Sequence, residues 1–308
     1  METNWKKGQF IVNPKADQWG VGVITEDSRG NELKAFFEHE CAVKVLRLDY
    51  VQPKEVEPGP ARSFLENALV DDEYAGKYDR EPFPTKLKRF IEDFPGGFTG
   101  EMLKNHERDY KWAAHEYCIE HLNQEMFKAM LETEQYSELA TEIKRLYSKV
   151  NLLASFEMIK LNDALKDVDA QKNVTLALYD LLYGESLIQD RFNNTVKEFS
   201  RYEMDKWPTV TYPLFIRYPE TYLFVKPSVT KEAAANRGYN IAYTSDVKWD
   251  AYQRILNFGN ELAERLNNSD SEMLHPKDMI DVQSFMWCMF TNGWTKDEID
   301  KAKLELGL

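Results

Sequence analysis

Apolar and polar residues alternate along the first forty positions of the chain. An apolar residue at every second position is the pattern of a half-buried strand. The apolar members of these runs are Phe10 and Val12, then Val21 and Val23, then Leu33, Ala35 and Phe37. Asn13-Pro14 breaks the first run, and Ser28-Arg29-Gly30-Asn31 reads as the hairpin turn between the second and the third. The pattern predicts a small antiparallel sheet.

Two glycines stand on either side of Val21. Within a strand, glycine marks a bulge or a close approach of two backbones. Gly20 and Gly22 therefore predict a corner of a small closed barrel, with Trp19 at the turn before them. Trp19 and Phe37 are the residues of this barrel that we expect to contact a partner, although packing across the barrel mouth accounts for Trp19 equally well.

Prolines separate this first unit from the rest of the chain. Three of them, Pro53, Pro58 and Pro60, stand in the stretch Val51–Pro60, which favours a linker because proline cannot donate to a strand ladder or continue a helix. The sequence thus predicts a barrel over residues 1–53, a linker with a connecting helix over 54–82, and a mainly helical domain over 83–308. The expected fold class is α+β.

Beyond the linker, apolar positions repeat every three to four residues, as in amphipathic helices. In the longest stripe, Leu139, Ile143, Leu146, Val150 and Leu153 step by four, three, four and three. Thr295 and Glu298 form a capping box that opens the last helix. Trp207–Pro213, with two prolines, reads as a stiff connector, and residues 222–227 read as a short strand or an extended segment. The expected helices cover residues 61–70, 86–94, 101–133, 137–165, 171–183, 187–203, 229–236, 248–266 and 276–290.

The N-terminal motifs resemble those of a known barrel. Gly8-x-x-x-Val12-x-Pro14, Trp19-Gly-x-Gly-x-Ile24 and Ala35-Phe-Phe-Glu-His39 resemble the small bacterial Tudor-like barrel of the CarD and UvrD C-terminal type, over roughly residues 5–53. That resemblance implies docking on a protein partner such as RNA polymerase or a DNA-repair helicase. The chain departs from the family at the following turn, where a Gly and a Lys are usual and Glu40-Cys41 stands instead.

The helical part also resembles other bacterial sequences. Phe94–Phe98, His106–Lys111, Phe224–Lys231 and Asp278–Trp287 are similar to segments that follow this barrel in uncharacterised bacterial proteins. The string Asp281-Val-Gln-Ser-Phe285 is similar to the tails of proteins near restriction and phage-defence genes. This second resemblance brings no activity with it.

Charge and composition restrict the class of partner and the cellular compartment that we expect for this protein. The net charge is −13, and an acidic chain is not drawn to nucleic acid by its overall field, so that a local basic patch would have to bind DNA against it. No apolar run approaches the ~20 residues of a membrane helix. The N-terminus lacks the apolar core of a signal peptide, and three cysteines far apart read as reduced thiols. We therefore expect a cytoplasmic protein with a protein partner.

No catalytic motif emerges. His115 and His121 are six residues apart on a helix, so they cannot share one metal ion as an i, i+4 pair does. The string Gly96-Gly-Phe-Thr-Gly100 lacks the Lys-Ser/Thr of a phosphate loop. Asp246-Val-Lys248 has no strand acid upstream, as a nuclease would need. We expect neither a metal nor a cofactor.

The best local site is the start of an Ala-rich helix. There Ser228 or Thr230 could cap free backbone N–H groups while lysines converge, which favours an anion such as a phosphate or a carboxylate. An ordinary capped helix is the alternative. The candidate anion-binding residues are Lys226, Ser228, Thr230, Lys231 and Arg237.

Each of two further clusters can be interpreted as purely structural or as functional. His106, Arg108 and Lys111 lie near one another at helical spacing and read as a surface ion-pair patch or as a second polar cluster. Phe285 and Trp287, close to Asp278 and Asp281, read as core or as a mixed polar and aromatic groove.

Taken together, the sequence favours a non-catalytic binding or adaptor protein. The barrel would dock on a protein of the transcription, DNA-repair or phage-defence machinery, and the helical body would bind a second partner or a nucleic acid. The alternative is a metal-dependent nuclease or a nucleotide-handling enzyme of a bacterial defence system, with its site assembled from distant residues.

Overall fold

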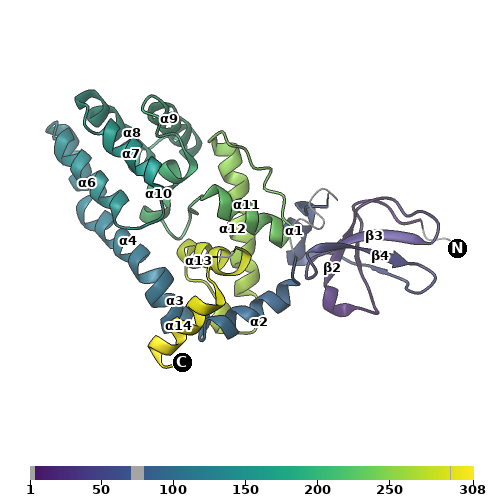
Figure 1. Ribbon diagram of the computed structural model, residues 1–308. Helices are drawn as coiled ribbons and strands as arrows, with labels where there is room; N and C mark the ends of the chain where they lie inside the picture. Colours follow the sequence, from purple (N-terminus) through teal and green to yellow (C-terminus); the bar gives the residue numbers. More distant parts are fainter. Residues whose placement is uncertain (1–3, 71–79, 292) are drawn as a thin grey trace.

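A computed structural model describes residues 4–70, 80–291 and 293–308. The fold is α+β, as expected, with one antiparallel sheet near the N-terminus followed by helices (Figure 1). The sheet forms one end of an elongated molecule, and α6 to α9 form the other (Figure 1). Residues 71–79, part of the segment expected to connect the two units, lie outside the described residues.

Five strands make the sheet, in the order β4-β3-β2-β1-β5. The outermost strands, β4 and β5, do not pair with each other among the described residues, so the sheet is open there rather than closed into the expected barrel. The hairpin between β2 and β3 carries the predicted turn, where Arg29 bridges to Glu32. The strands are β1 (Phe10–Val12), β2 (Val21–Ile24), β3 (Glu32–Phe37), β4 (Ala42–Arg47) and β5 (Lys54–Glu55).

Both faces of the sheet are covered, which the alternation alone did not reveal. One face holds a small core that includes Ile11, Leu33 and Phe37. The other face packs on the helical body through Phe36, Val21 and similar residues. The alternating apolar residues therefore divide between the two faces. Phe10, Val12, Val21 and Val23 lie on the opposite face from Leu33 and Phe37, and Ile11 and Ile24 take the small-core positions.

The two glycines beside Val21 do mark close approaches. Gly20 has a φ of +73°, and a Cβ there would lie 2.8 Å from the Glu38 side chain. A Cβ on Gly22 would lie 2.7 Å from the Phe37 ring. Both positions thus require glycine so that β2 can pack against the end of β3.

The proline-rich stretch is not a free linker. Lys54 and Glu55 form β5 and pair with Val12 and Ile11 of β1. Proline stands just outside this short pairing, at positions 53 and 58, where no ladder hydrogen bond is lost. The sheet therefore extends beyond residue 53, and Pro58 leads directly into the short helical turn before α1.

The helical body follows the predicted periodicity with shifted boundaries. The capping box of the last helix is confirmed, since Glu298 N donates to Thr295 Oγ1 at 3.3 Å and Thr295 N donates to Glu298 Oε2 at 2.8 Å. Within the described ranges, none of the helices is both long and apolar enough to cross a membrane. The helices are α1 (Arg62–Glu66), α2 (Phe83–Asp93), α3 (Glu101–Leu103), α4 (Asp109–His121), α5 (Gln124–Glu132), α6 (Tyr136–Ser148), α7 (Ser155–Ala164), α8 (Val168–Tyr183), α9 (Ile188–Ser200), α10 (Trp207–Arg217), α11 (Pro227–Arg237), α12 (Trp249–Asn267), α13 (Met279–Phe290) and α14 (Lys296–Leu306).

The two long predicted helices are each interrupted. A π-helical turn, η4 (Lys104–Arg108), separates α3 from α4, and Asn123 caps a new helix by accepting from Met126 N at 3.0 Å. The second prediction splits into α6 and α7. Its apolar stripe is nevertheless buried along its full length, including Val150 and Leu153 beyond the end of α6. The spacing thus predicted correctly which residues are buried, but it predicted one continuous helix where the structure has two.

The predicted connector at Trp207–Pro213 is helix α10, whose first ten residues are buried. Pro208 lies in the first turn, where a helix needs no N–H from it. Pro213 leaves the carbonyl of Thr209 without its helical partner, and the Tyr147 hydroxyl donates to that oxygen at 2.7 Å. A tertiary hydrogen bond therefore allows the helix that local sequence argued against.

Buried charges join the sheet to the helical body. The turn between β3 and β4 enters the body, where Arg237 Nη1 donates to Glu38 O at 3.0 Å and lies 3.2 Å from Cys41 Sγ. The Glu38 side chain forms an ion pair with Arg265 of α12. The residue at which the sequence departs from the Tudor-like pattern, Cys41, has a φ of +53° and is 1% exposed. The two parts are interlocked rather than independent.

His39 in this turn makes the junction sensitive to acid. Burial lowers the pKa of His39 below its ordinary 6.5, and a hydrogen bond from its ring to Gln18 O opposes that shift. A histidine with a lowered pKa stabilises the fold above its unfolded pKa, and this stability is lost as the pH falls through the lowered value. The free energy of unfolding is therefore expected to fall as the pH drops below about 6.5, with a shallower slope in H39Q.

Urea denaturation at a series of pH values measures this slope. His121, whose side chain is 39% exposed, supplies the matched control, because H121Q removes a histidine outside the junction. Equal slopes in H39Q and the wild type would contradict the assignment.

Candidate functional site

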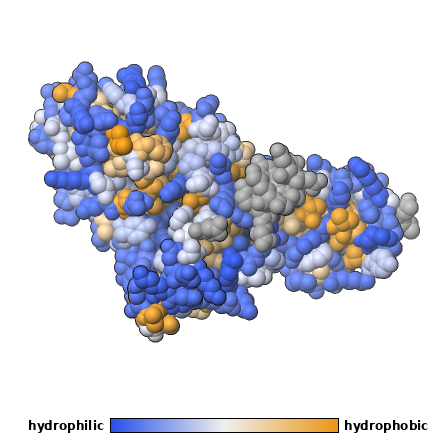
Figure 2. Space-filling model, viewed as in Figure 1, coloured by the Kyte–Doolittle hydropathy of each residue, from blue (hydrophilic) through white to orange (hydrophobic). Residues whose placement is uncertain are grey.

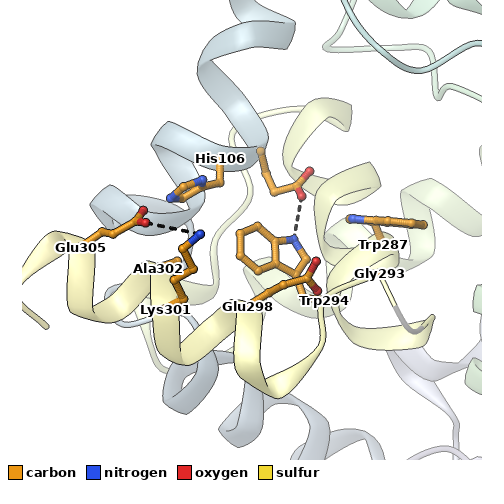
Figure 3. Close-up of a pocket in the computed structure, with 9 residues that line it drawn as sticks. His106, Trp287, Gly293, Trp294, Glu298, Lys301, Ala302 and Glu305 are labelled. Atoms are coloured by element: carbon orange, nitrogen blue, oxygen red, sulfur yellow. Dashed lines mark hydrogen bonds and ion pairs between the residues drawn. The ribbon is translucent and has the colours of Figure 1, made fainter.

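A pocket of about 360 Å³ lies where η4, α13 and α14 meet. It combines the two polar and aromatic clusters that the sequence singled out, since His106 lies on η4 and Trp287 near the end of α13. Trp294 stands between them, with His106 and Lys301 on one side of its ring and Trp287 on the other (Figure 3). We call this the indole pocket; it is lined by His106, Glu107, Trp287, Gly293, Trp294, Glu298, Lys301, Ala302 and Glu305.

A buried chain of hydrogen bonds holds the Trp294 ring. Its Nε1 donates to Glu107 Oε1 at 2.8 Å. The other oxygen of Glu107 accepts from Lys111 Nζ at 3.1 Å, and Lys111 also donates to Ser284 Oγ at 2.9 Å. Lys111 is fully buried, and Glu107 is 6% exposed. The ring is therefore fixed by a desolvated ion pair rather than by surface packing alone.

The π-helical turn brings Glu107 and Arg108 to this place. One extra residue in the turn shifts the side chains of η4 relative to those of α4. Arg108 donates to both carboxylate oxygens of Asp278, at 3.0 and 2.6 Å, and to Asp281 Oδ1 at 2.7 Å. Burial lowers the pKa of Arg108, but the hydrogen bonds and charges of the two aspartates outweigh it and raise the pKa. These contacts clamp η4 to the start of α13.

Burial also acts on the acids behind the pocket. It raises the pKa of Asp281, and the Arg108 charge opposes that rise. Burial raises the pKa of Tyr110 as well, reinforced by the negative charge of Glu107. Burial also raises the pKa of the Cys288 thiol. The groups behind the pocket are thus held neutral or paired, and the open charges lie at its mouth.

The mouth of the pocket is acidic. Two carboxylates, Glu298 and Glu305, line it together with one lysine, Lys301, which pairs with Glu305 at 3.9 Å. Hydrogen bonds from Thr295 lower the pKa of Glu298, so that this carboxylate is ionised. Figure 2 shows a mostly hydrophilic surface around α14, with an apolar spot at its C-terminal end, where Leu304 and Leu308 are exposed. A fixed indole beneath ionised carboxylates can accept a cation on its π-face.

The predicted anion site is not assembled. Helix α11 begins at Pro227, earlier than expected, so its N-cap residue is Lys226 and no side chain caps it; Ser228 and Thr230 lie inside the helix. Thr230 is buried. Lys231 lies 5.1 Å from the Tyr243 ring. Arg237 lies at the far end of the helix, about 15 Å away at 1.5 Å per residue, where Glu261 pairs with it at 3.0 Å. Lys226 instead reaches the Trp287 ring, at 5.9 Å from its centroid.

The two residues of the sheet that were predicted to contact a partner, Trp19 and Phe37, differ in their exposure to solvent. Phe37 is fully buried in the small core and cannot touch a partner. Trp19 is half-buried, with its ring 5.1 Å from that of Phe37 and Lys44 Nζ 5.5 Å above it. The large apolar groups that do reach the surface here are Val45, 54% exposed, and Tyr50, 69% exposed. Alternation could not tell these from inward residues because both faces of the sheet are used.

The residues weighed for metal or nuclease chemistry lie apart. His115 Nδ1 is 2.7 Å from Ile216 O, and Cys118 is buried. Asp246 and Lys248 pair with each other at 3.5 Å on an exposed turn. Across the described residues, no three His, Cys, Asp or Glu side chains gather as a metal site would require.

Sequence reasoning missed the centre of the indole pocket. Trp294 lies outside every motif considered, and Glu298 was assigned only to helix capping. The available signal was the string Gly293-Trp-Thr295, since an aromatic residue directly before a capping box is placed at a helix entrance. A Cβ on Gly293 would lie 2.4 Å from the Trp287 ring, so this glycine lets the two tryptophans share one pocket.

Comparison with known proteins adds no assignment. No model of a protein family matches the chain, and neither a curated protein nor a solved structure is significantly similar to it. The function is therefore argued from the geometry.

Proposed function

We propose that the protein is a non-catalytic binding protein whose indole pocket captures a cationic side chain of a partner. The observation that carries this proposal is the pinned ring of Trp294 under an acidic mouth. A cation over an indole face is stabilised by roughly 0.5–2 kcal/mol, more where water is excluded. The net charge of −13 adds a long-range field that draws basic partners toward the chain.

The N-terminal sheet supplies a second docking surface in this proposal. We infer that it is a variant of the Tudor-like barrel, open between β4 and β5, and that a cytoplasmic partner from the transcription, DNA-repair or phage-defence machinery docks on it. The support is the motif resemblance together with the exposed Val45 and Tyr50. Because the turn after β3 is locked into the helical body, a partner on the sheet and a cation in the pocket would be held at a fixed separation.

Charge reversal at the mouth of the pocket tests the proposal. Binding of a hexalysine peptide to the full chain, measured by calorimetry, is expected to weaken about tenfold in E305K, which corresponds to about 1.4 kcal/mol. The matched control is E132K. Glu132 is similarly exposed and, like Glu305, pairs with a lysine four residues earlier at 3.9 Å, so both variants change the net charge equally.

The pair of variants separates a local site from a general field. Equal weakening in E305K and E132K would show that only the net charge attracts the peptide. A peptide acetylated on its lysine side chains should not bind, and binding of that form would also overturn the proposal.

A further inference from the structure

A second pocket, of about 370 Å³, lies on the opposite half of the helical body. Its walls come from the end of α8, the first turn of α9, the end of α10 and the segment that follows α10. Three tyrosine rings line it, those of Tyr183, Tyr218 and Tyr222. Among its lining residues Arg191 alone carries a full charge. Its character is thus the reverse of the indole pocket, which has an acidic mouth.

Arg191 is held at this pocket by one edge of its guanidinium. Nη1 donates to Leu181 O at 2.9 Å and to Asp180 O at 3.3 Å, which are carbonyls of the last turn of α8. Nε is buried and has no hydrogen-bond partner. A buried unpartnered donor is costly, and such groups in native proteins commonly mark a bound water, ion or ligand.

Glycine at position 184 makes room for this arginine. A Cβ there would lie 2.3 Å from the carboxylate oxygen Oδ1 of Asp180, 2.6 Å from Asp180 O and 2.8 Å from Arg191 Cδ. The backbone of Gly184 has ordinary extended angles, with φ −63° and ψ 157°. The position therefore requires glycine for space and not for conformation, so that the end of α8 and Arg191 can meet.

The strongest charges acting on the hydroxyls of Tyr218 and Tyr222 are positive. Burial raises the pKa of Tyr222, and among the charged groups near it Arg191 acts more strongly than Glu220, in the opposite direction. At Tyr218, after burial, the largest influences are Arg217 and Arg191, ahead of Glu220. The Arg217 guanidinium lies 4.5 Å from the centre of the Tyr218 ring. A negative group entering the pocket would meet these positive charges.

We propose that this pocket binds a nucleoside monophosphate, with the phosphate on Arg191 and the base against the tyrosine rings. Arginine pairs with phosphate through parallel N–H donors and suits it better than lysine does. Every nucleobase has a π-face that stacks on aromatic side chains, at roughly 1–3 kcal/mol per base. The volume lies at the lower end of the range for small-molecule pockets, about 300–1,000 Å³. The site extends beyond the proposed cation capture and is independent of it.

Calorimetry on the full chain with three probes tests the assignment. Adenosine 5′-monophosphate is expected to bind at least tenfold more tightly than either adenosine or inorganic phosphate, because only the nucleotide engages both the rings and the arginine. In R191Q its affinity should fall at least tenfold. The control is R201Q, which removes an exposed arginine at the end of the same helix, paired with Glu198 at 3.2 Å, and should bind as the wild type does.

A second variant separates the two parts of the ligand. Y222L should weaken the nucleotide and adenosine together while leaving phosphate unchanged, and it keeps the test valid if R191Q unfolds, as its melting temperature would reveal. Equal affinities of the nucleotide for R191Q and R201Q, equal affinities of phosphate and the nucleotide for the wild type, or no binding of the nucleotide at millimolar concentration would each overturn the proposal.

Discussion

Replacing Arg237 with alanine is expected to lower the free energy of unfolding by about 3–5 kcal/mol, because removal of one partner of a buried ion pair leaves Glu261 with only the more distant Arg265, whose Nε lies 3.7 Å from Glu261 Oε1. Arg237 is fully buried and pairs with Glu261, which is 7% exposed. Its guanidinium also lies between two rings, 3.7 Å from the centre of Phe64 and 4.4 Å from that of Phe83. Urea unfolding followed by circular dichroism measures the loss.

The same variant should acquire a pH dependence. Burial raises the pKa of Glu261, and Arg237 opposes that rise. Without Arg237 the pKa of Glu261 rises further, so stability is present at low pH and is lost as the pH rises through the raised value. R201A, at an exposed ion pair, is the control and should change stability by less than about 1 kcal/mol. A loss in R237A no larger than in R201A would contradict the role of Arg237 as the junction between sheet and helices.

Alanine at Arg108 is expected to have an effect of similar size, about 3–5 kcal/mol for a broken buried ion pair. Two carboxylates, Asp278 and Asp281, would lose their common partner, and they are 8% and 0% exposed in their side chains. Asp278 also caps α13, accepting from Ile280 N at 2.9 Å. Thermal unfolding should show the loss, and binding of hexalysine should weaken with it, since η4 would no longer be clamped at the indole pocket.

The comparison variant is R145A. Arg145 forms an ion pair with Glu142, but its side chain is 61% exposed, so its removal should change stability little. Unchanged peptide binding in a folded R108A would show that the clamp does not position the pocket.

The sequence predicted local structure well where a single helix face decides burial. The stripe from Leu139 to Leu153 is buried as expected, because a spacing of three and four residues places side chains on one side of a helix. The capping box at Thr295 needs only residues three positions apart. Gly184 ends α8, as predicted. These signals are contained within one turn or one face and need no distant partner.

Predictions failed where a residue far away in the sequence changes which local structure or which buried face is favoured. Proline at 213 argued for a connector, yet the hydroxyl of Tyr147 satisfies the carbonyl that the proline leaves open. Alternation in the first strands identified a two-faced sheet but not which face the small core takes, because the helical body covers the other face. The candidate anion site failed for a similar reason, since Arg237 is drawn into the body by Glu261.

The candidate sites likewise combine residues that the sequence singled out with an arrangement that only the fold provides. Residue types alone pointed to His106, Arg108 and Lys111 and to Trp287 as two separate clusters, each with a bland interpretation. The fold brings His106 and Trp287 together around Trp294, with Lys111 behind the ring on Glu107 and Arg108 on Asp278 and Asp281. It also assembles the tyrosine-lined pocket, mainly from α8, α9 and α10, without any motif in the sequence.

By itself the sequence determined an α+β chain with a small N-terminal sheet, a mainly helical remainder and an acidic surface. Those properties follow from the spacing of apolar residues within each segment and from the count of charged residues, and neither depends on which distant residues meet in the fold. Only the tertiary structure decided that sheet and helices form one interlocked body and where the indole pocket and the tyrosine-lined pocket lie. The reason is physical: a buried charge such as Arg237 or Lys111 is tolerated only beside its partner, and that partner is chosen in space, across up to two hundred residues of chain.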